Sequence, residues 1–323
     1  MARAVRYHKQ GGPEVLQLDE ITVGEPGPGQ VRIRHTAIGV NFVDVYQRSG
    51  LYPVQLPGVG GNEGAGVVEA VGTGVKDLKK GDRVAYTGLP GSYCDQRIVP
   101  ADRMVKIPKG ISDEQAASMM LKGMTVHYLI HSTYKVKKGE TVLWHAAAGG
   151  VGLIAGQWLK KLGVTAIGTV GSDEKAKLAK AHGYKHVINY STENWVEKVK
   201  ELTKGKKLAV IYDAVGKTTW DGSLDSLAPR GLMVSFGNAS GPVPPQNLGI
   251  LASKGSLYVT RPTLATYIAA RADLVKRSND LFNAVKSKKV KIETTARYKL
   301  ADAAQAHRDL EGRKTTGSVV LIP

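Results

Sequence analysis

A glycine-rich turn in the middle of the chain carries the clearest chemical signal. The sequence AAAGGVG at positions 146–152 follows an apolar run, Thr141–His145, and precedes an apolar helical pattern that extends to Leu162. A strand, a glycine turn and a helix in this order are the context that the dinucleotide-binding fingerprint requires. Aligned to G-x-G-x-x-G, the fingerprint positions are Ala147, Gly149 and Gly152. We therefore expect a pyrophosphate to bind at the amino terminus of this helix, where free N–H groups favour anions.

The end of the next strand indicates which nicotinamide cofactor this turn would hold. Sites that prefer NAD normally place an Asp or Glu about 20 residues beyond the turn, against the ribose 2′-hydroxyl. Here the strand Thr165–Val170 ends in Gly171-Ser172. Ser172 can donate a hydrogen bond to a 2′-phosphate, and Lys175 can bring a positive charge one helical turn later. Two acidic residues directly after Ser172 leave an alternative, in which they face solvent at the helix start and Lys175 is an ordinary surface lysine. We expect NADPH.

Alternating strands and helices must position these residues. From Glu140 onward, strand-like runs alternate with amphipathic helical patterns, which implies a doubly wound parallel sheet covered on both faces. The expected strands are Thr141–His145, Thr165–Val170, His186–Asn189, Leu208–Asp213 and Leu232–Phe236, and the expected helices are Val151–Leu162, Asp173–His182, Trp195–Leu202 and Thr219–Leu227.

The two ends of the chain have another pattern. Up to Lys122, short strand-like runs separated by Pro/Gly turns predict a β-barrel, and the capping box Ser112–Gln115 predicts a helix start. After Arg261 we expect a tail that returns to this first domain. The expected runs of the first domain are Ala2–Tyr7, Val15–Glu20, Val31–Ile38, Gly66–Val71 and Arg83–Tyr86, and those of the tail are a long helix from Leu264 to Val285, a strand over Ile292–Tyr298, a helix over Asp302–Leu310 and a strand over Ser318–Ile322.

Composition restricts the class of protein. The chain has 323 residues with 42% hydrophobic side chains, which is ordinary for a globular protein. No segment approaches the roughly 18 apolar residues that cross a bilayer, and the first residues lack the apolar core of a secretory signal. Cys94 is the only cysteine, which excludes internal disulfides and favours the cytoplasm. The net charge is +17, but the lysines occur as scattered pairs, which favours a solvated surface over a nucleic-acid site.

The glycine turn also resembles that of a known family. The sequence HAAAGGVG from His145 to Gly152 is similar to the cofactor turn of the quinone oxidoreductase, or zeta-crystallin-like, branch of the medium-chain dehydrogenase/reductase superfamily. The resemblance covers essentially the whole chain, through GVNFVD and the following Tyr at 39–46, RSGLYP at 48–53, GNEGAGVV at 61–68, GDRV at 81–84, VSFGNASG at 234–241 and the segment Arg313–Pro323.

This resemblance implies a fold and an assembly. It implies a GroES-like β-barrel domain over residues 1–123 plus 263–323, with a Rossmann domain inserted at 124–262 and the cofactor between the two. Members of this branch are usually homodimers that pair their sheets edge to edge, and the matching edge here is Gly255–Thr260.

The resemblance also implies the site residues. Asn41, Tyr46 and Tyr52 match the positions that line the nicotinamide and the substrate, and we expect them to orient the substrate or stabilise an oxyanion. The alternative is that Tyr46 simply packs in a helix and Tyr52 in a loop. The expected cofactor contacts are Asn41, Thr125, Ala147, Gly149, Gly150, Val151, Gly152, Gly171, Ser172, Lys175, Tyr190, Phe236, Gly237, Asn238 and Arg313.

Zinc is not expected. Alcohol dehydrogenases of the superfamily hold zinc with a Cys and a His at positions where this chain has Asn41 and Asn62. Amides are poor zinc ligands, because zinc prefers thiolate and imidazole. Without a Lewis acid to polarise an alcoholate, simple alcohol oxidation is disfavoured.

Three hypotheses about function remain. The first is a zinc-independent, NADPH-dependent quinone reductase, favoured by the closeness of the matches at Asn41–Pro53 and Gly149–Gly152. The second is an enone or enal double-bond reductase, which shares every cofactor residue. The third, of another class, is an AU-rich RNA-binding protein, which the +17 charge would help but no motif supports. The sequence leaves the physiological substrate open, and also whether electrons leave singly or in pairs.

Overall fold

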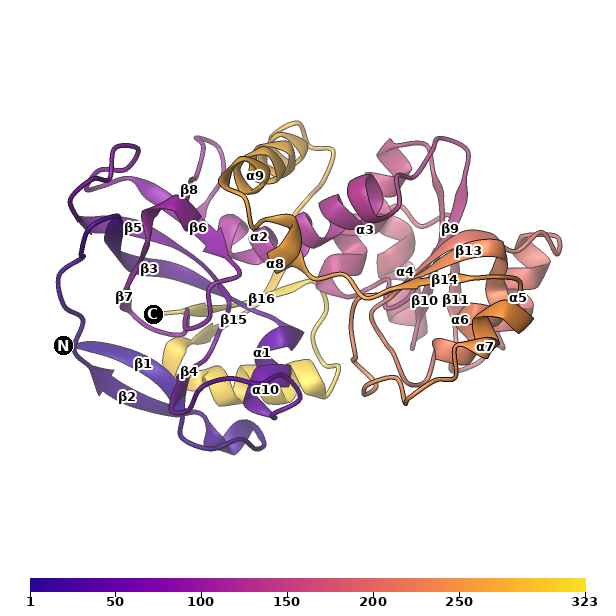
Figure 1. The fold of residues 1–323 in the computed structure, drawn as a ribbon, viewed down its shortest axis with the longest axis horizontal. Helices are drawn as coiled ribbons and strands as arrows, with labels where there is room; N and C mark the ends of the chain where they lie inside the picture. Colours follow the sequence, from indigo (N-terminus) through magenta and orange to yellow (C-terminus); the bar gives the residue numbers. More distant parts are fainter. The chain divides into compact units, whose positions relative to one another are not determined.

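The computed structural model describes residues 1–323, and the chain divides into two compact units that we describe separately (Figure 1). Unit 1 comprises Met1–Met124, Tyr267–Ser287 and Ile292–Pro323, and unit 2 comprises Thr125–Thr266 and Lys288–Lys291. No helix has the length and apolar character needed to cross a membrane. The domain limits expected from the family resemblance, 1–123 plus 263–323 and 124–262, stay a prediction.

Unit 1 is built mainly on antiparallel strands, as the short runs and turn residues predict. A three-stranded sheet has the order β2-β1-β4, and a larger sheet has the order β15-β16-β3-β5-β6-β8, with β7 also paired to β3. Alternate residues of β3, including Val31 and Ile33, are fully buried in the core with Val84 and Val99. The bounds are β1 Ala2–Tyr7, β2 Gln17–Ile21, β3 Gln30–Val40, β4 Gly58–Val59, β5 Glu63–Val71, β6 Arg83–Thr87, β7 Gln96–Pro100, β8 Val105–Lys106, β15 Thr294–Lys299 and β16 Ser318–Ile322.

The tail returns to this unit. The strand β16 pairs antiparallel with β3, through Val319 opposite Val40, and β15 pairs parallel with β16. The helix α2, Asp113–Tyr128, begins with the predicted capping box, in which Ser112 and Gln115 exchange hydrogen bonds of 3.1 Å. The remaining helices of unit 1 are α1 Phe42–Arg48, α9 Arg271–Lys286 and α10 Ala303–Glu311, whereas α8, Leu264–Tyr267, belongs mostly to unit 2.

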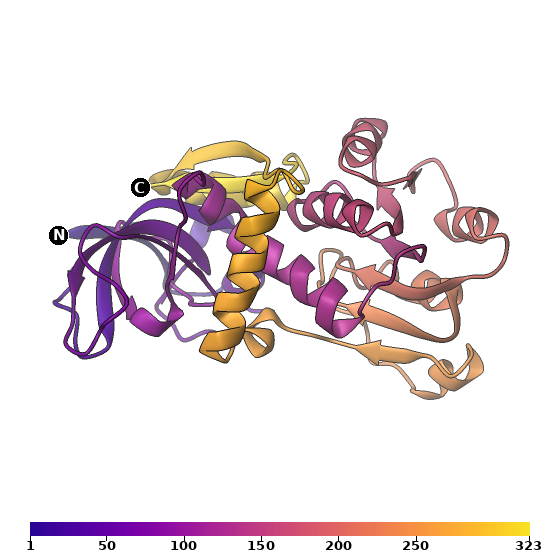
Figure 2. The same ribbon diagram turned by 90° about the horizontal axis from the view of Figure 1, so that it is seen from above.

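Unit 2 is a Rossmann domain. Its six strands are all parallel, in the order β11-β10-β9-β12-β13-β14, which is the doubly wound order with its reversal between β9 and β12. Figure 2 shows this sheet from above, with helices beside it. Apolar strand residues such as Leu143, Ile167 and Ile211 form its core. The bounds are β9 Thr141–Trp144, α3 Gly150–Lys161, β10 Thr165–Val170, α4 Asp173–Ala181, β11 His186–Asn189, α5 Trp195–Leu202, β12 Leu208–Asp213, α6 Trp220–Ser226, β13 Leu227–Ser235, α7 Gly249–Ser253 and β14 Tyr258–Thr260.

The expectation of one long helix from Leu264 to Val285 is wrong, because the chain breaks between α8 and α9. The side chain of Arg103 donates to the carbonyl oxygens of Ile268 and Ala269, at 2.9 and 3.1 Å. Ile268 itself is fully buried. In a continuous helix these two carbonyl groups would accept backbone N–H groups of the helix instead of the arginine side chain.

The expected strand Val15–Glu20 also differs from the structure, because Pro13–Val15 forms a 3-10 turn before β2 begins.

Candidate active site

The glycine turn of unit 2 leaves a helix start open. Ala146 has a positive φ of 55°, and the backbone N–H of Ala147 donates to the carbonyl of Thr169 on β10 at 3.0 Å. The chain then enters α3 at Gly149, which is exposed, and no side chain caps the helix. The first N–H groups of a helix lack internal partners, so this terminus can receive a phosphate.

Two glycines of the turn have different roles. A Cβ on Gly152 would lie 2.5 Å from the carbonyl oxygen of Ala146 and 2.6 Å from that of Ala147, so only glycine lets α3 pack this closely on the turn. A Cβ on Gly149 would meet only the oxygen of Ala146, at 3.3 Å, and would otherwise point into open space. Gly152 is therefore required by packing, whereas the side of Gly149 is open, and the binding of a pyrophosphate there stays a prediction.

The tip of β10 carries no carboxylate. Ser172 is the N-cap of α4, and its Oγ accepts the backbone N–H of Lys175 at 3.3 Å. Asp173 accepts a hydrogen bond from the amide of Asn189 at 2.9 Å. The backbone N–H of Glu174 itself and the Ser172 hydroxyl lower the pKa of the Glu174 carboxyl. Both acids lie in the first turn of α4 and are exposed, so they complement the helix dipole.

Tyr190 lies beside the end of β10. Its ring is so near Gly171 that a Cβ there would lie 2.6 Å from the tyrosine hydroxyl. Tyr190 follows β11, and 44% of its surface is exposed, so its ring faces the solvent at the edge where the strands end. Gly171 and Tyr190 therefore lie side by side, next to the N-cap Ser172 in the chain, and the binding of a 2′-phosphate there stays a prediction.

The other predicted contacts of unit 2 lie after β13 and on α2. Arg261 donates to the carbonyl of Ser235 at 2.7 Å and to the side-chain oxygen of Asn238 at 3.2 Å, when the Asn238 amide is oriented to donate to Gly237. A Cβ on Gly237 would lie 2.4 Å from the oxygen of Ala214. The ring of Phe236 packs against Trp144, and Thr125 is buried on α2.

A buried polar network beneath the turn was not predicted. His145 ends the apolar run into the turn, and its ring nitrogens contact Thr169 Oγ1 at 2.8 Å and Ser223 Oγ at 3.0 Å. Ser223 donates to Asp213 Oδ2 at 3.1 Å. Burial lowers the pKa of His145, which keeps the imidazole neutral. No solvent reaches this histidine, serine and aspartate, so the network fixes the turn rather than attacking a substrate.

In unit 1, Asn41 is held from both sides. It is the N-cap of α1, and its backbone N–H donates to Asp44 Oδ2 at 2.8 Å. Its side-chain amide donates to Glu63 Oε2 at 2.9 Å. Glu63 is fully buried, and its other oxygen accepts the backbone N–H of Leu121 at 2.7 Å. The nearby Lys122 ammonium lies 3.7 Å from Glu63, although burial still raises the pKa of that carboxyl.

The two predicted tyrosines form one aromatic pair. The ring centroids of Tyr46, on α1, and Tyr52 are 5.1 Å apart, and the two ring planes are inclined at 61° in an edge-to-face arrangement. The backbone N–H of Tyr52 donates to the carbonyl of Tyr46 at 2.9 Å, which folds the loop after α1 back onto the helix. Tyr46 is buried and Tyr52 is half-buried.

The predicted cofactor contact Arg313 also belongs to unit 1. It follows α10, is exposed and has a φ of 57°.

The residues at the zinc-ligand positions do not fit a zinc ion. Asn62 donates its amide to Asp44 Oδ1 at 2.8 Å and to Gln47 Oε1 at 2.6 Å, and Asn41 donates to Glu63. Both amides therefore present hydrogens where a metal would need lone pairs. Lys122 places a further positive charge beside this group. No cluster of three or more His, Cys, Asp or Glu side chains in the chain has a metal-binding arrangement.

No site role was predicted for Asp44, Glu63 or Lys122. Asp44 had a detectable signal, because an acid three residues after an N-cap asparagine can accept a hydrogen bond from the backbone N–H of that asparagine.

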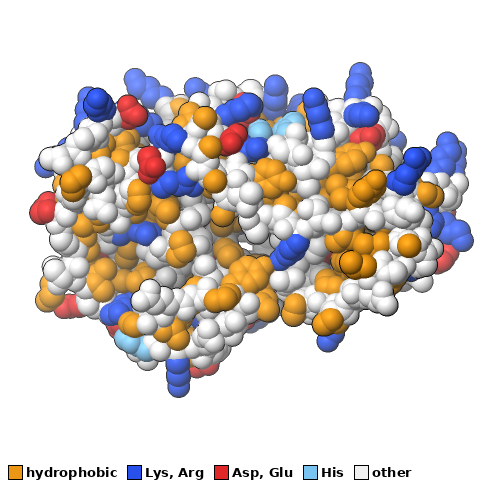
Figure 3. Space-filling view, in the orientation of Figure 1, with side chains coloured by type: hydrophobic (Ala, Val, Ile, Leu, Met, Phe, Trp, Pro, Cys, Tyr) orange, Lys and Arg blue, Asp and Glu red, His pale blue; other side chains and the backbone are white.

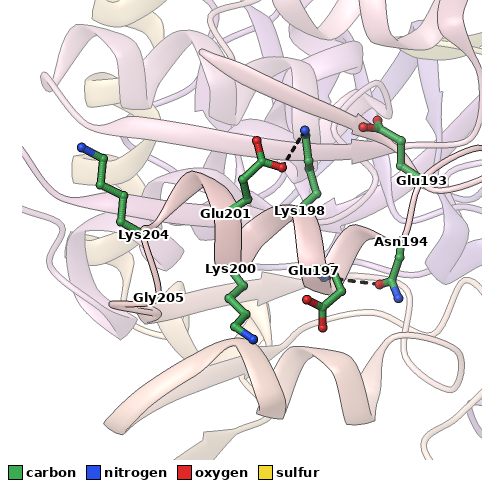
Figure 4. A pocket seen from close by; sticks show the side chains of 8 residues that line it. All are labelled: Glu193, Asn194, Glu197, Lys198, Lys200, Glu201, Lys204 and Gly205. Atoms are coloured by element: carbon green, nitrogen blue, oxygen red, sulfur yellow. Dashed lines mark hydrogen bonds and ion pairs between the residues drawn. The ribbon is translucent and has the colours of Figure 1, made fainter.

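An open depression on the surface of unit 2 involves no predicted site residue (Figure 4), and its Lys198–Glu201 ion pair indicates a solvated face of α5. It is lined by Glu193, Asn194, Glu197, Lys198, Lys200, Glu201, Lys204 and Gly205.

Comparison with known proteins defines the class. Residues 27–109 match the alcohol dehydrogenase GroES-like domain, and residues 150–283 match the family described as zinc-binding dehydrogenase. Together with the parallel sheet of unit 2, these matches identify a medium-chain dehydrogenase/reductase. The fold expected from the sequence, a Rossmann domain with a GroES-like domain, is confirmed.

Individual relatives define the family. The chain is 54% identical to a quinone oxidoreductase of Pseudomonas aeruginosa over the full length of both proteins. The crystal structure of Escherichia coli quinone oxidoreductase complexed with NADPH matches with a TM-score of 0.98 and 51% identity, covering all of both chains. A 2-haloacrylate reductase from Burkholderia sp is 47% identical over all of this chain and 99% of its own. The chain belongs to the quinone oxidoreductase family, as the resemblance predicted.

Proposed function

We propose that this protein is a zinc-independent reductase that transfers reducing equivalents from NADPH to quinones. The observation that carries the proposal is the combination of an open glycine turn with a β10 tip that lacks a carboxylate and is formed by Gly171, Ser172 and Tyr190. A 2′-phosphate would meet no fixed negative charge from the strand end itself. Family membership and the NADPH complex of the E. coli relative support the same assignment.

The chain's own residues bind and orient the reactants. NADPH supplies the hydride when it is bound. The start of α3 would hold the pyrophosphate, and Ser172 and Lys175 would hold the 2′-phosphate. The region near the nicotinamide would lie against Gly237 and Asn238. Further contacts would come from Thr125 and Arg313. Asn41 uses one amide hydrogen on Glu63 and keeps a second for an incoming oxygen. A quinone is already electron-poor, so hydrogen-bond donors suffice to stabilise the oxyanion that forms.

A substrate panel tests the proposal. Loss of NADPH absorbance should be rapid with ortho- and para-quinones, and primary alcohols should not be oxidised with NADP⁺. Tyr46→Phe or Tyr52→Phe should lower kcat about 10- to 100-fold for the hydroxyl that stabilises the oxyanion. Tyr134→Phe is a matched control, because Tyr134 donates to Glu140 in another part of the fold. No turnover of any quinone would refute the proposal.

The second candidate is reduction of an activated double bond. The 47% identity to a 2-haloacrylate reductase favours it, because both acceptors are conjugated with a carbonyl group. The same panel should include enals, enones and haloacrylates. Turnover of these compounds without turnover of quinones would replace the first assignment by this one.

We also propose a homodimer that forms along β14. This strand is the last of the parallel sheet, so its outer backbone groups have no strand partner there. Tyr258 is 60% exposed and Val259 38% exposed on it. Tyr258→Asp should convert a dimer to a monomer in light scattering, while Leu18→Asp, at an exposed residue of β2, should not.

The distribution of lysine and arginine gives little support to RNA binding. Figure 3 shows Lys and Arg side chains scattered over the visible face, without one continuous tract. AU-rich RNA binding therefore stays a prediction, to be tested by salt-dependent retention on RNA. A cytoplasmic location also stays a prediction, supported by the single, buried thiol of Cys94.

A further inference from the structure

A chain of buried hydrogen bonds joins α10 of the tail to α1. The two helices are in contact in unit 1 (Figure 1). Glu311 receives two hydrogen bonds from Arg48, at 2.8 and 2.9 Å, and Arg48 donates to His307 Nδ1 at 3.1 Å. The other ring nitrogen of His307 lies 3.0 Å from the hydroxyl of Tyr93, which lies 2.9 Å from Asp44 Oδ2. The chain thus ends on the carboxylate that holds the backbone N–H of Asn41.

The chemistry of the groups fixes the direction of every hydrogen. A guanidinium can only donate, so His307 Nδ1 must accept from Arg48. A neutral imidazole then carries its hydrogen on Nε2, so His307 donates to the oxygen of Tyr93. Tyr93 in turn donates its hydroxyl hydrogen to Asp44. All hydrogens therefore point toward Asp44, which receives further hydrogens from Asn41 and Asn62.

Burial makes this arrangement hard to rearrange. Arg48 and His307 are almost completely buried, while Glu311 is half-buried and anchors the guanidinium. Burial, with the nearby Arg48, lowers the pKa of His307 to about 3, so the imidazole is neutral. Burial raises the pKa of Asp44 to about 6 although three hydrogen-bond donors oppose this shift, so the carboxyl is ionised at neutral pH.

We propose that Arg48, His307 and Tyr93 are positioning residues for the substrate site, because they hold Asp44 in one orientation and Asp44 holds Asn41 and Asn62. The proposal rests on the function proposed above, in which Asn41 orients the substrate. The network does not deliver protons, because Arg48 cannot accept one at its outer end. Its effect is geometric: removing a link should displace the start of α1, and a shift of about 1 Å near the reacting atoms can lower a rate roughly 100-fold.

Two substitution series test the role. Tyr93→Phe removes the donor to Asp44 and should lower kcat with quinone roughly 10- to 100-fold. The dissociation constant of NADPH should stay within about 2-fold, because the contacts proposed for the pyrophosphate and the 2′-phosphate lie in unit 2, whereas Tyr93 lies in unit 1. The matched control is Tyr298→Phe, which removes another hydrogen bond from a tyrosine to a carboxylate of α10, at Asp309, but has no link to Asp44. This control should keep wild-type kcat.

The second series provides rescue. His307→Gln can still donate to Tyr93 and should retain most of kcat, whereas His307→Leu cannot and should match Tyr93→Phe. A merely structural role would lower the melting temperature and the fraction of enzyme that binds NADPH, but not kcat per NADPH-binding site. Equal kcat per site in His307→Gln, His307→Leu and wild type would overturn the proposal.

A spectroscopic test is independent of catalysis and of whether Tyr93→Phe folds. In protein labelled with ¹⁵N-histidine, the signals that His307→Gln deletes should report hydrogen on Nε2 and none on Nδ1, unchanged between pH 5 and 8. A hydrogen on Nδ1, or titration in this range, would overturn the proposal. If wild type shows this tautomer but reduces no quinone, the proposed function fails and the hydrogen-bond arrangement stands.

Discussion

Gly149→Ala should separate cofactor binding from folding. Gly149 has φ of −76° and ψ of 165°, a conformation that alanine adopts without strain, and its side faces open space. The added methyl group would stand where the fingerprint alignment places the pyrophosphate. We therefore expect apo-protein stability close to that of wild type together with weak NADPH binding.

The magnitudes follow from the local geometry. Alanine is a poorer N-cap than glycine, which costs somewhat less than about 1 kcal/mol, and it lowers the entropy of the unfolded chain, which contributes about 0.4–1 kcal/mol. These terms nearly cancel, so the melting temperature should change by less than about 3 °C. A methyl group forced against a bound ligand costs about 1–3 kcal/mol, which corresponds to roughly 5- to 150-fold in the NADPH dissociation constant.

Two further substitutions complete the experiment. Gly152→Ala would bring a Cβ within 2.5–2.7 Å of backbone atoms of Ala146 and Ala147, so it should lower the melting temperature by about 5 °C or more. Gly24→Ala, an open site with nothing near its Cβ, should change neither property. Melting curves of apo-protein and NADPH fluorescence titrations measure both effects. Unchanged NADPH affinity in folded Gly149→Ala would refute the assignment of the turn as the pyrophosphate site.

Three other outcomes are expected. Lys175→Ala should weaken NADPH about 10- to 100-fold and NADH hardly at all, because only NADPH carries the 2′-phosphate; equal loss for both, or a wild type that prefers NADH, would contradict that role. Activity should survive a strong chelator, and stoichiometric zinc that leaves together with activity would reverse the metal assignment. Since the pKa of Asp44 is raised to about 6 in the fold, its contribution to stability is fully present below pH 4 and is lost as the pH rises through 6. The stability of wild type relative to Asp44→Asn should therefore fall by on the order of 3 kcal/mol between pH 4 and 7 in urea unfolding, and a constant difference would show that Asp44 does not titrate as stated.

The Rossmann half could be predicted closely from local sequence. The strands β10, β11 and β12 and the helix α5 have the predicted bounds, because buried parallel strands are continuous apolar runs between turn residues. The break after α8 could not be predicted in this way. It depends on Arg103, which reaches the chain from a position 165 residues away, and no local pattern records such a partner.

In the candidate site, too, local motifs could be predicted but contacts between residues far apart in the sequence could not. The glycine turn and Ser172 are local motifs, so their places at the starts of α3 and α4 could be predicted from spacing alone. The hydrogen bond between Tyr93 and His307 joins residues 214 positions apart, and neither residue has a distinctive neighbourhood in the sequence. The zinc-ligand positions could be identified from Asn41 and Asn62, but the carboxylates that hold the two amides became visible only in the fold.

The pairing of β16 with β3 has a consequence for synthesis on the ribosome. Unit 2 is formed mainly by one continuous stretch, Thr125–Thr266, so its sheet can be completed while the rest of the chain is still being made. The sheet of unit 1 must wait for Ser318–Ile322, because Val319, Val320 and Leu321 pair with Val40, Gly39 and Ile38. Until then the Ile38–Val40 part of β3 has no partner on one edge, because β7 pairs only with Gln30–Arg34, and an unpaired edge promotes association with other chains. Loss of β16 should therefore damage the sheet whose other strands are synthesised much earlier, and the nascent protein should depend most on chaperones until β16 has left the ribosome.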